Sequence, residues 1–292
     1  MNTLYFVIQS VINLINKLLQ KKGEVIISKP RATDYQMGGK TLIVPVIINE
    51  KGDWKEWLSL PFESQYSKED MSNCVSQAGI NAIEAYLNYQ VKNKLIPDEL
   101  IEGLNGLKFF NEQGFIKLST RFTSKMAGTT KQGLQMTAFW DSVRKDGFLP
   151  MALWQDPKTY NWNEYYSEIP QKYKDFAKNL VKIFKIQYEW VVQGNCKTNT
   201  TILKNALMLS PLFVACPSCP RSFDSIQRPC GTCQTTHSRV IYSIDELTNV
   251  LDTYPPFLTK TSNDYPAPWV IRFKFTLNDE YGIVMEDMRK IV

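Results

Sequence analysis

The chain has 292 residues, of which 43% are hydrophobic and 22% charged, and its formal net charge is +5. This length and composition suit one large or two modest globular domains and exclude a low-complexity or disordered chain. Lysine and arginine are spread along the sequence rather than clustered, so charge gives no support to a nucleic-acid partner.

Residues 1–50 form an expected N-terminal extension. Over residues 1–20, apolar side chains recur at helical spacing on one face and polar side chains occupy the other, which predicts an amphipathic helix. The apolar run is too interrupted to span a membrane, and it has neither the basic start nor the cleavage site of a signal peptide. We expect this helix to pack on its own domain or to bind a protein partner, with binding to a membrane surface as the alternative. Strand-like stretches follow at 24–28 and 41–48.

Residues 51–292 predict a single α+β domain, with helices mostly first and strands mostly second. Apolar periodicity and helix caps indicate helices at residues 72–92, 134–145, 172–184 and 200–209. Short apolar runs indicate strands at residues 188–192, 212–215, 239–242 and 269–275. Ser243 followed by Glu246 has the pattern of a capping box, which predicts a short helix over residues 244–251.

The candidate catalytic residues centre on His237, the only histidine in the chain. Imidazole is the side chain best suited to carry protons near neutral pH. Cys74 opens the predicted helix at 72–92, where the helix dipole stabilises a thiolate. Asp252 follows the predicted short helix and could orient the imidazole if the chain folds back. Gln65 could donate its side-chain amide to an oxyanion, together with the backbone N–H of Cys74. The order Gln, Cys, His, Asp therefore indicates a nucleophile with its base and an orienting group.

The segments around these residues resemble the papain-like cysteine peptidases, most closely the divergent members encoded by bacteriophages and their hosts. The Gln and Cys region matches at residues 62–65 and 72–76, and the substrate-cleft stretch at 121–133 and 143–150. The best candidates for the His and the Asn/Asp positions are at 236–242 and 251–254. The likeness covers most of residues 54–275. Val75 stands where papain has a tryptophan after the cysteine.

This resemblance implies a papain-like fold, with Cys74 in an N-terminal helical half and His237 and Asp252 in a C-terminal antiparallel β half. It implies a cysteine endopeptidase acting on a peptide or protein substrate. In it His237 deprotonates Cys74, the thiolate attacks a peptide carbonyl, and Gln65 helps to hold the oxyanion. In the family a short helix like that at 244–251 precedes the histidine, and no histidine follows it here, so loss of the true base stays an alternative.

Two further functions are open at the level of sequence. A peptidoglycan-cleaving amidase or endopeptidase of the same superfamily would use the same cysteine, histidine and third polar residue. A non-enzymatic virion or scaffold protein would retain the fold and assemble through the helix at residues 1–20. Cleavage of casein-like peptides, compared with cleavage of purified peptidoglycan, separates the first function from the peptidase. The substitution Cys74→Ala would leave the second function intact.

The chain has six cysteines, and four of them form two CxxC pairs separated by ten residues, namely Cys216, Cys219, Cys230 and Cys233. This spacing predicts a structural Zn²⁺ site with four thiolate ligands, inserted as a zinc knuckle at residues 216–233. Two disulfides, free thiols, or a Cys₃His site that uses His237 are the alternatives. Cys74 and Cys196 lie apart from this cluster. Such a distribution favours a reducing compartment, cytoplasmic or virion-associated.

Overall fold

A computed structural model of the chain describes residues 25–27, 31, 34–37, 43, 47–157, 160–219, 222, 224–279 and 281–289. The predicted helix at 1–20 and most of the predicted strand at 41–48 lie outside these residues. Of the predicted strand at 24–28, the structure contains β1 (Val25–Ile26). Within the described ranges, no helix has the length and hydropathy that crossing a bilayer requires.

The first part of the described chain is mainly helical. Its longest helix, α2 (Cys74–Lys92), is buried along most of its length and confirms the helix predicted at 72–92. The predicted helices at 134–145 and 172–184 are confirmed as α5 (Met136–Asp146) and α7 (Gln171–Ile183). The remaining elements of this half are η1 (Lys55–Trp57), α3 (Asp98–Gly106), α4 (Thr120–Met126), β2 (Leu134–Gln135), η2 (Met151–Leu153) and α6 (Trp162–Tyr165). Strand β2 pairs in parallel with β1.

The second part is built on a seven-stranded sheet in the order β3-β9-β4-β6-β7-β8-β5. All pairs are antiparallel except β5 with β8. The strands are β3 (Phe184–Gln193), β4 (Leu212–Cys216), β5 (Ile226–Gln227), β6 (His237–Ile244), β7 (Thr248–Leu251), β8 (Leu258–Thr261) and β9 (Trp269–Leu277). Helix α8 (Thr200–Leu207) follows β3, and α9 (Tyr281–Arg289) ends the described chain. The strands predicted at 188–192, 212–215, 239–242 and 269–275 are confirmed.

The predicted helix at 244–251 is wrong, because this segment turns and returns as strand β7. Asp245 holds the turn through its backbone N–H to the carbonyl of Leu247, and its side chain accepts from the Leu247 N–H at 2.8 Å. Leu251 then pairs with Val240 of β6. A capping-box pattern is a local signal, whereas β7 gains backbone partners on both sides from strands β6 and β8. This hairpin brings Asp252 back beside the start of β6.

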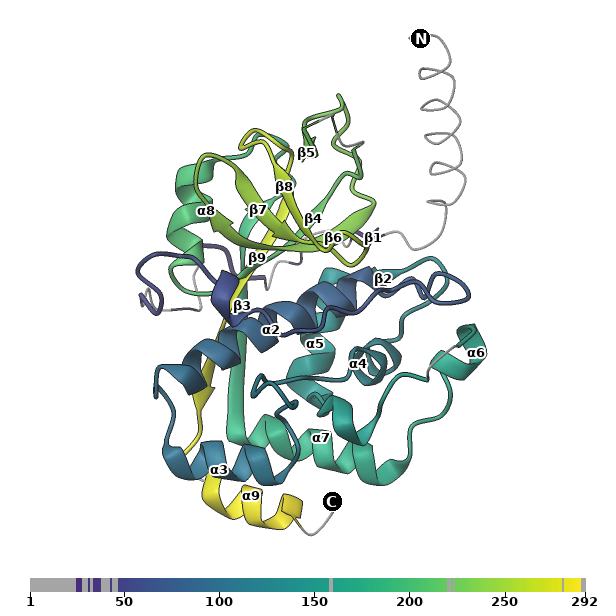
Figure 1. The fold of residues 1–292 in the computed structure, drawn as a ribbon, viewed down its shortest axis with the longest axis vertical. Coiled ribbons are helices and arrows are strands. Elements are labelled where there is room, and N and C mark those ends of the chain that lie inside the picture. Colours follow the sequence, from purple (N-terminus) through teal and green to yellow (C-terminus); the bar gives the residue numbers. More distant parts are fainter. Residues whose placement is uncertain are drawn as a thin grey trace.

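Helix α2 lies at the boundary between the helical half and the sheet, against β6 (Figure 1). Aromatic side chains join the two halves. Phe139 of α5 lies 5.7 Å from Phe213 of β4, and Trp140 lies 4.8 Å from Phe273 of β9, measured between ring centroids. Strands β3 and β9 extend past the rest of the sheet toward the helices at the end of the molecule that carries α9 (Figure 1). The first residue of α2 thus meets the start of β6 at the boundary between the halves.

Candidate active site

Cys74 is the first residue of α2, and the chain reaches it through a sharp bend. Ser72 has a φ of 52°, in the left-handed region, and its backbone N–H donates to Oδ1 of Asp70 at 2.7 Å. Asn73 occupies the N-cap position, but its side chain donates to the Tyr165 hydroxyl at 2.7 Å instead of capping the helix. The bend places the Cys74 sulfur at the positive end of the helix dipole.

The Cys74 side chain is completely buried, with 0% exposed. Burial raises the pKa of its thiol to about 12, although backbone hydrogen bonds from Ser238 and Val75 oppose the rise. The negative charges of Asp70 and Asp252 raise the pKa further. Because Ser238 follows His237 directly on β6, its bond to the sulfur brings Cys74 next to the base-bearing strand.

His237, the residue before Ser238, forms a buried pair with Asp252. Nε2 of His237 lies 2.7 Å from Oδ1 of Asp252, and both side chains are almost inaccessible. The same carboxylate oxygen accepts the backbone N–H of Thr253 at 2.7 Å. Burial would raise the pKa of Asp252, but the charges of Arg239 and His237 and these hydrogen bonds hold it well below its usual value. Asp252 is therefore an anion that fixes the imidazole ring.

Gln65 lies next to this group and is fully buried. Its side-chain NH₂ donates to Oδ1 of Asp70 at 2.9 Å and to the hydroxyl of Tyr254 at 2.6 Å, while its side-chain oxygen accepts from Thr253 Oγ1 at 2.5 Å. An amide NH₂ has two donors, and both are used here. The expected donation to an oxyanion would therefore require Gln65 to exchange one of these bonds.

Tyr254 covers the histidine and links the two halves. Its ring stacks on the His237 ring, with centroids 5.4 Å apart and planes inclined by 25°. Its hydroxyl donates to Oδ2 of Asp70 and accepts from Gln65. The backbone N–H of Gln65 also donates to the carbonyl of Thr253 at 3.1 Å. These bonds hold the segment before α2 against the segment after β7, and the site is closed in this structure.

The structure thus brings Cys74, His237, Asp252 and Gln65 together, and their catalytic roles stay predictions. The residues that hold this group together were not predicted from the sequence, and they are Asp70, Arg239, Thr253 and Tyr254. Arg239 carried a usable signal, because alternate residues of a strand share a face and it lies two residues after His237. The contact between Tyr254 and Asp70 spans 184 positions in the sequence, and no local pattern indicates it.

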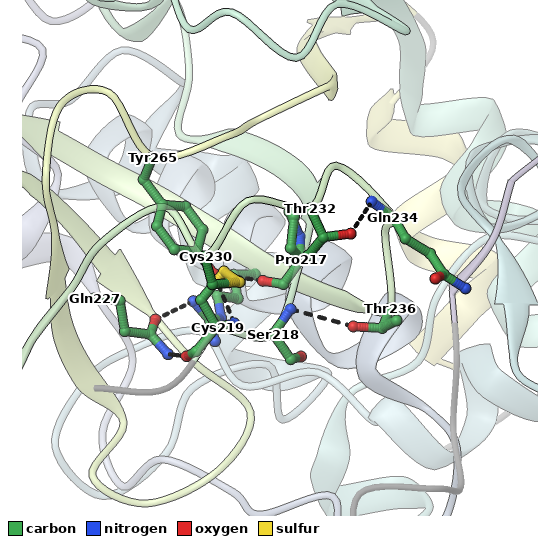
Figure 2. The surroundings of a disulfide bond; sticks show 10 residues. Pro217, Ser218, Cys219, Gln227, Cys230, Thr232, Gln234, Thr236 and Tyr265 are labelled. Carbon is green, nitrogen blue, oxygen red and sulfur yellow. Dashed lines mark hydrogen bonds between the residues drawn. A yellow bond between two sulfur atoms is a disulfide. The ribbon is translucent and has the colours of Figure 1, made fainter. Parts of the chain in front are cut away.

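The cysteines are arranged differently from the predicted zinc knuckle. Cys219 is bonded to Cys230 and Cys196 to Cys233, while Cys216 is a buried free thiol. Figure 2 shows the first of these disulfides, with Gln227 and Tyr265 beside it. In the described ranges, no three histidine, cysteine, aspartate or glutamate side chains come together as a metal site.

Disulfide sulfurs lack the negative charge of the thiolates that Zn²⁺ prefers, so the cysteines in this arrangement do not fit a four-thiolate site. The structure does not support the zinc knuckle, and zinc binding by the reduced chain stays a prediction. Disulfides persist mainly in oxidising compartments. The two bonds, Cys196–Cys233 and Cys219–Cys230, therefore point away from the reducing compartment that the sequence favoured.

Three solved structures resemble this fold. Xylellain, a cysteine protease from Xylella fastidiosa, is 15% identical with a TM-score of 0.53, over 86% of this chain and 96% of that chain. Amb a 11, a ragweed pollen cysteine protease solved in its proform, is 13% identical with a TM-score of 0.48, over 80% and 68%. The Carica candamarcensis cysteine protease CMS1MS2, solved with E-64, is 12% identical with a TM-score of 0.47, over 77% and 97%. No known family model or curated protein matches the sequence. The likeness to xylellain confirms the predicted papain-like fold.

Proposed function

We propose that the chain is a cysteine endopeptidase that hydrolyses peptide bonds through a thiolate and an acyl-enzyme. The observation that carries this proposal is the grouping of Cys74 with the His237–Asp252 pair. The cysteine begins a helix and takes a hydrogen bond from Ser238, the residue after the histidine. The histidine in turn is held at 2.7 Å by a buried carboxylate. A nucleophile, a base and an orienting group in this order are the parts that acyl transfer needs.

Asp252 fixes which nitrogen of the ring acts. Because the carboxylate is ionised and 2.7 Å from Nε2, that nitrogen carries a hydrogen and donates a hydrogen bond to Asp252. Nδ1 is then the nitrogen that takes the proton from the Cys74 thiol. The thiolate attacks the peptide carbonyl, forming a carbon–sulfur bond and an oxyanion. His237 returns the proton to the leaving amine as the carbon–nitrogen bond breaks, and water then hydrolyses the thioester to release the acid and the thiol.

We further propose that catalysis requires an open form of the site. Cys74 is 0% exposed, so a substrate reaches the sulfur only after Tyr254 and the residues near Gln65 move apart. Breaking the hydrogen bond between Gln65 and Asp70 would free one amide N–H of Gln65. That N–H and the backbone N–H of Cys74 would then stabilise the oxyanion.

Hydrolysis of casein by the purified chain tests this function. We expect cleavage by the wild type and none by Cys74→Ser, which keeps the size of the side chain and removes the thiolate. Cys216→Ser is the matched control, because Cys216 is the other buried free thiol among the described residues and should be dispensable for cleavage. Cleavage of purified peptidoglycan but not of casein would favour the amidase instead. If neither casein nor peptidoglycan is cleaved and Cys74 does not react with an alkylating agent, an enzymatic function is contradicted.

The predictions from sequence that lie outside this site are proposals with tests of their own. Residues 1–20 are proposed as a protein-binding helix and residues 51–292 as the peptidase domain. A chain lacking only residues 1–20 keeps strand β1 and its pairing with β2, so it should still cleave casein and lose that partner. Structural zinc is tested by metal analysis of the chain purified with and without reductant. One zinc per chain in the reduced form alone would support the predicted four-cysteine site.

A further inference from the structure

A buried arginine stands behind the carboxylate of Asp252. Nε of Arg239 lies 3.0 Å from Oδ2 of Asp252, and both side chains are only 4% exposed. The other carboxylate oxygen, Oδ1, faces His237 at 2.7 Å. Each oxygen of Asp252 therefore has its own charged or polar partner. The carboxylate cannot turn away from the histidine without also losing its contact with the arginine.

Arg239 is itself fixed by groups that have no contact with the reacting atoms. Its Nη1 donates to the side-chain oxygen of Gln227 on β5, and Gln227 donates to the carbonyl of Cys219 at 2.8 Å. The Tyr265 hydroxyl takes part in a further hydrogen bond with Arg239. Gln227 and Tyr265 flank the Cys219–Cys230 disulfide (Figure 2). A cross-linked loop thus supports the arginine.

We propose that Arg239 is a positioning residue, which holds Asp252 toward His237 and cancels its charge so that the pair acts as a neutral hydrogen-bond acceptor. This inference rests on the proposed function. An isolated carboxylate in a dry site would favour a protonated imidazole and disfavour a nearby thiolate. An ion pair has no net charge, so it orients the ring as a neutral amide would.

The charges around the histidine make this neutrality testable. The titratable groups that face the His237–Asp252 pair are Cys74 of α2, Asp70 and Tyr254 across the boundary, and Arg239 with Cys216. Within the described part of the chain, Arg239 is the one permanent cation among them. Removing either Arg239 or Asp252 alone should therefore change the local charge by one unit, with opposite signs.

The experiment compares Arg239→Gln, Asp252→Asn and the double variant, using iodoacetamide alkylation of Cys74 as a function of pH. Arg239→Gln leaves an unpaired anion, so the acid limb of the profile should move up by about one pH unit. Asp252→Asn leaves an unpaired cation, so the limb should move down by about one unit. The double variant pairs two amides and should return to within about 0.3 units of the wild type, because the net charge is restored.

Folding is measured in the same set by thermal unfolding, because each single variant leaves a buried ion without its partner and can fail to fold. The double variant should melt above both single variants, since it contains no unpaired buried charge. Arg272→Met is the matched control. Arg272 forms another buried ion pair, at 2.7 Å from Glu189, on strands β9 and β3. The Arg272→Met substitution should lower the melting temperature without moving the alkylation profile of Cys74.

Three results would overturn the inference. The first is a shift of the acid limb in the same direction for both single variants. The second is a double variant whose acid limb lies as far from that of the wild type as that of the more shifted single variant. The third is a shift for Arg272→Met equal to that for Arg239→Gln. These readouts do not require turnover, so they are separate from a failure of the proposed function. Loss of casein cleavage in Cys74→Ser with no effect of Arg239→Gln would leave the peptidase proposal standing and remove the role of Arg239.

Discussion

Two buried carboxylates, one in each half of the molecule, have opposite charge behaviour. In the β half, Asp252 lies 3.0 Å from Arg239 and 2.7 Å from His237, and its pKa is held well below the usual value. In the α half, Glu84 accepts the backbone N–H of Leu118 at 2.7 Å and lies 3.4 Å from Lys117. Burial nevertheless raises the pKa of Glu84 to about 7.

Burial is the largest cause of the raised pKa of Glu84, and competition for its cation adds to it. Glu63 lies 3.9 Å from the same Lys117 ammonium, so two carboxylates share one charge. Glu63 raises the pKa of Glu84, and it adds to the effect of burial in raising the pKa of Asp156 to about 7. Asp252 pairs with Arg239, and no second carboxylate of the described residues forms an ion pair with this arginine. Burial is common to both sites, and the number of close cations per carboxylate decides whether the acid is ionised.

The largest expected effect comes from breaking the pair in the β half. Asp252→Ala leaves Arg239 buried without its counter-charge and His237 without its acceptor. Loss of one partner of a buried pair should lower the free energy of unfolding by about 3–5 kcal/mol. Urea denaturation of the variant and the wild type at pH 7 measures this loss. A loss below about 1 kcal/mol would mean that the pair behaves like one on the surface.

Removing the cation in the α half should lower the free energy of unfolding by less than Asp252→Ala does, and the loss should depend on pH. Lys117→Met takes away the ammonium that Glu84 and Glu63 share. At pH 7.5 we expect a loss of about 1.5–3 kcal/mol, the range for a hydrogen bond to a charged group. At pH 5 the loss should be less than half as large, because the buried carboxyl groups can then hold protons. Equal losses at the two pH values would contradict a protonated Glu84.

The Glu84 carboxyl should also contribute to the pH dependence of stability in the unmodified chain. Its pKa is raised from 4.5 to about 7 in the folded state, so its contribution is fully present below pH 4.5 and is lost as the pH rises through about 7. Glu84→Gln should reduce the fall in stability over this range by up to about 3 kcal/mol. Urea unfolding between pH 4.5 and 8 measures the change. Glu112→Gln, at an exposed carboxylate, should leave the profile as it is.

The smallest expected effect on stability comes from the tyrosine that closes the site. Tyr254→Phe keeps the ring on His237 and removes the hydroxyl that bonds to Asp70 and Gln65. The free energy of unfolding should fall by about 1 kcal/mol. Alkylation of Cys74 should become faster, because the two halves separate more readily. An unchanged rate would show that Tyr254 does not limit access to the sulfur.

Local sequence patterns predicted the elements that carry the site and failed where distant contacts decide. Apolar residues recur at helical spacing over residues 72–92, so a helix beginning near Cys74 could be predicted. The capping pattern at Ser243 predicted a helix where pairing with β6 and β8 gives a strand. Likewise, two CxxC pairs allow zinc or several disulfide connectivities, and sequence alone cannot choose among them.

The candidate site was predictable in part for the same reason. Residue type and position beside a helix or strand start indicated Cys74 and His237, and the structure places them at one boundary. The partners of Gln65 could not be predicted, because Thr253 and Tyr254 lie 188 and 189 positions away in the sequence. Arg239 was missed although the alternation of strand β6 puts it on the same face as His237.

Competitive alkylation of the two free thiols tests the pairing of Cys74 with His237 most directly. The intact folded chain is treated with iodoacetamide at pH 7 without reductant, and modification of Cys74 and Cys216 is followed by mass spectrometry. Both thiols are buried, and burial raises the pKa of Cys74 to about 12 and that of Cys216 to about 11, so burial alone would not favour reaction at Cys74. We expect Cys74 to react first, and His237→Ala to slow it by about tenfold or more while leaving Cys216 unchanged. Equal rates at the two cysteines, or a Cys74 rate indifferent to His237→Ala, would contradict the proposed peptidase site.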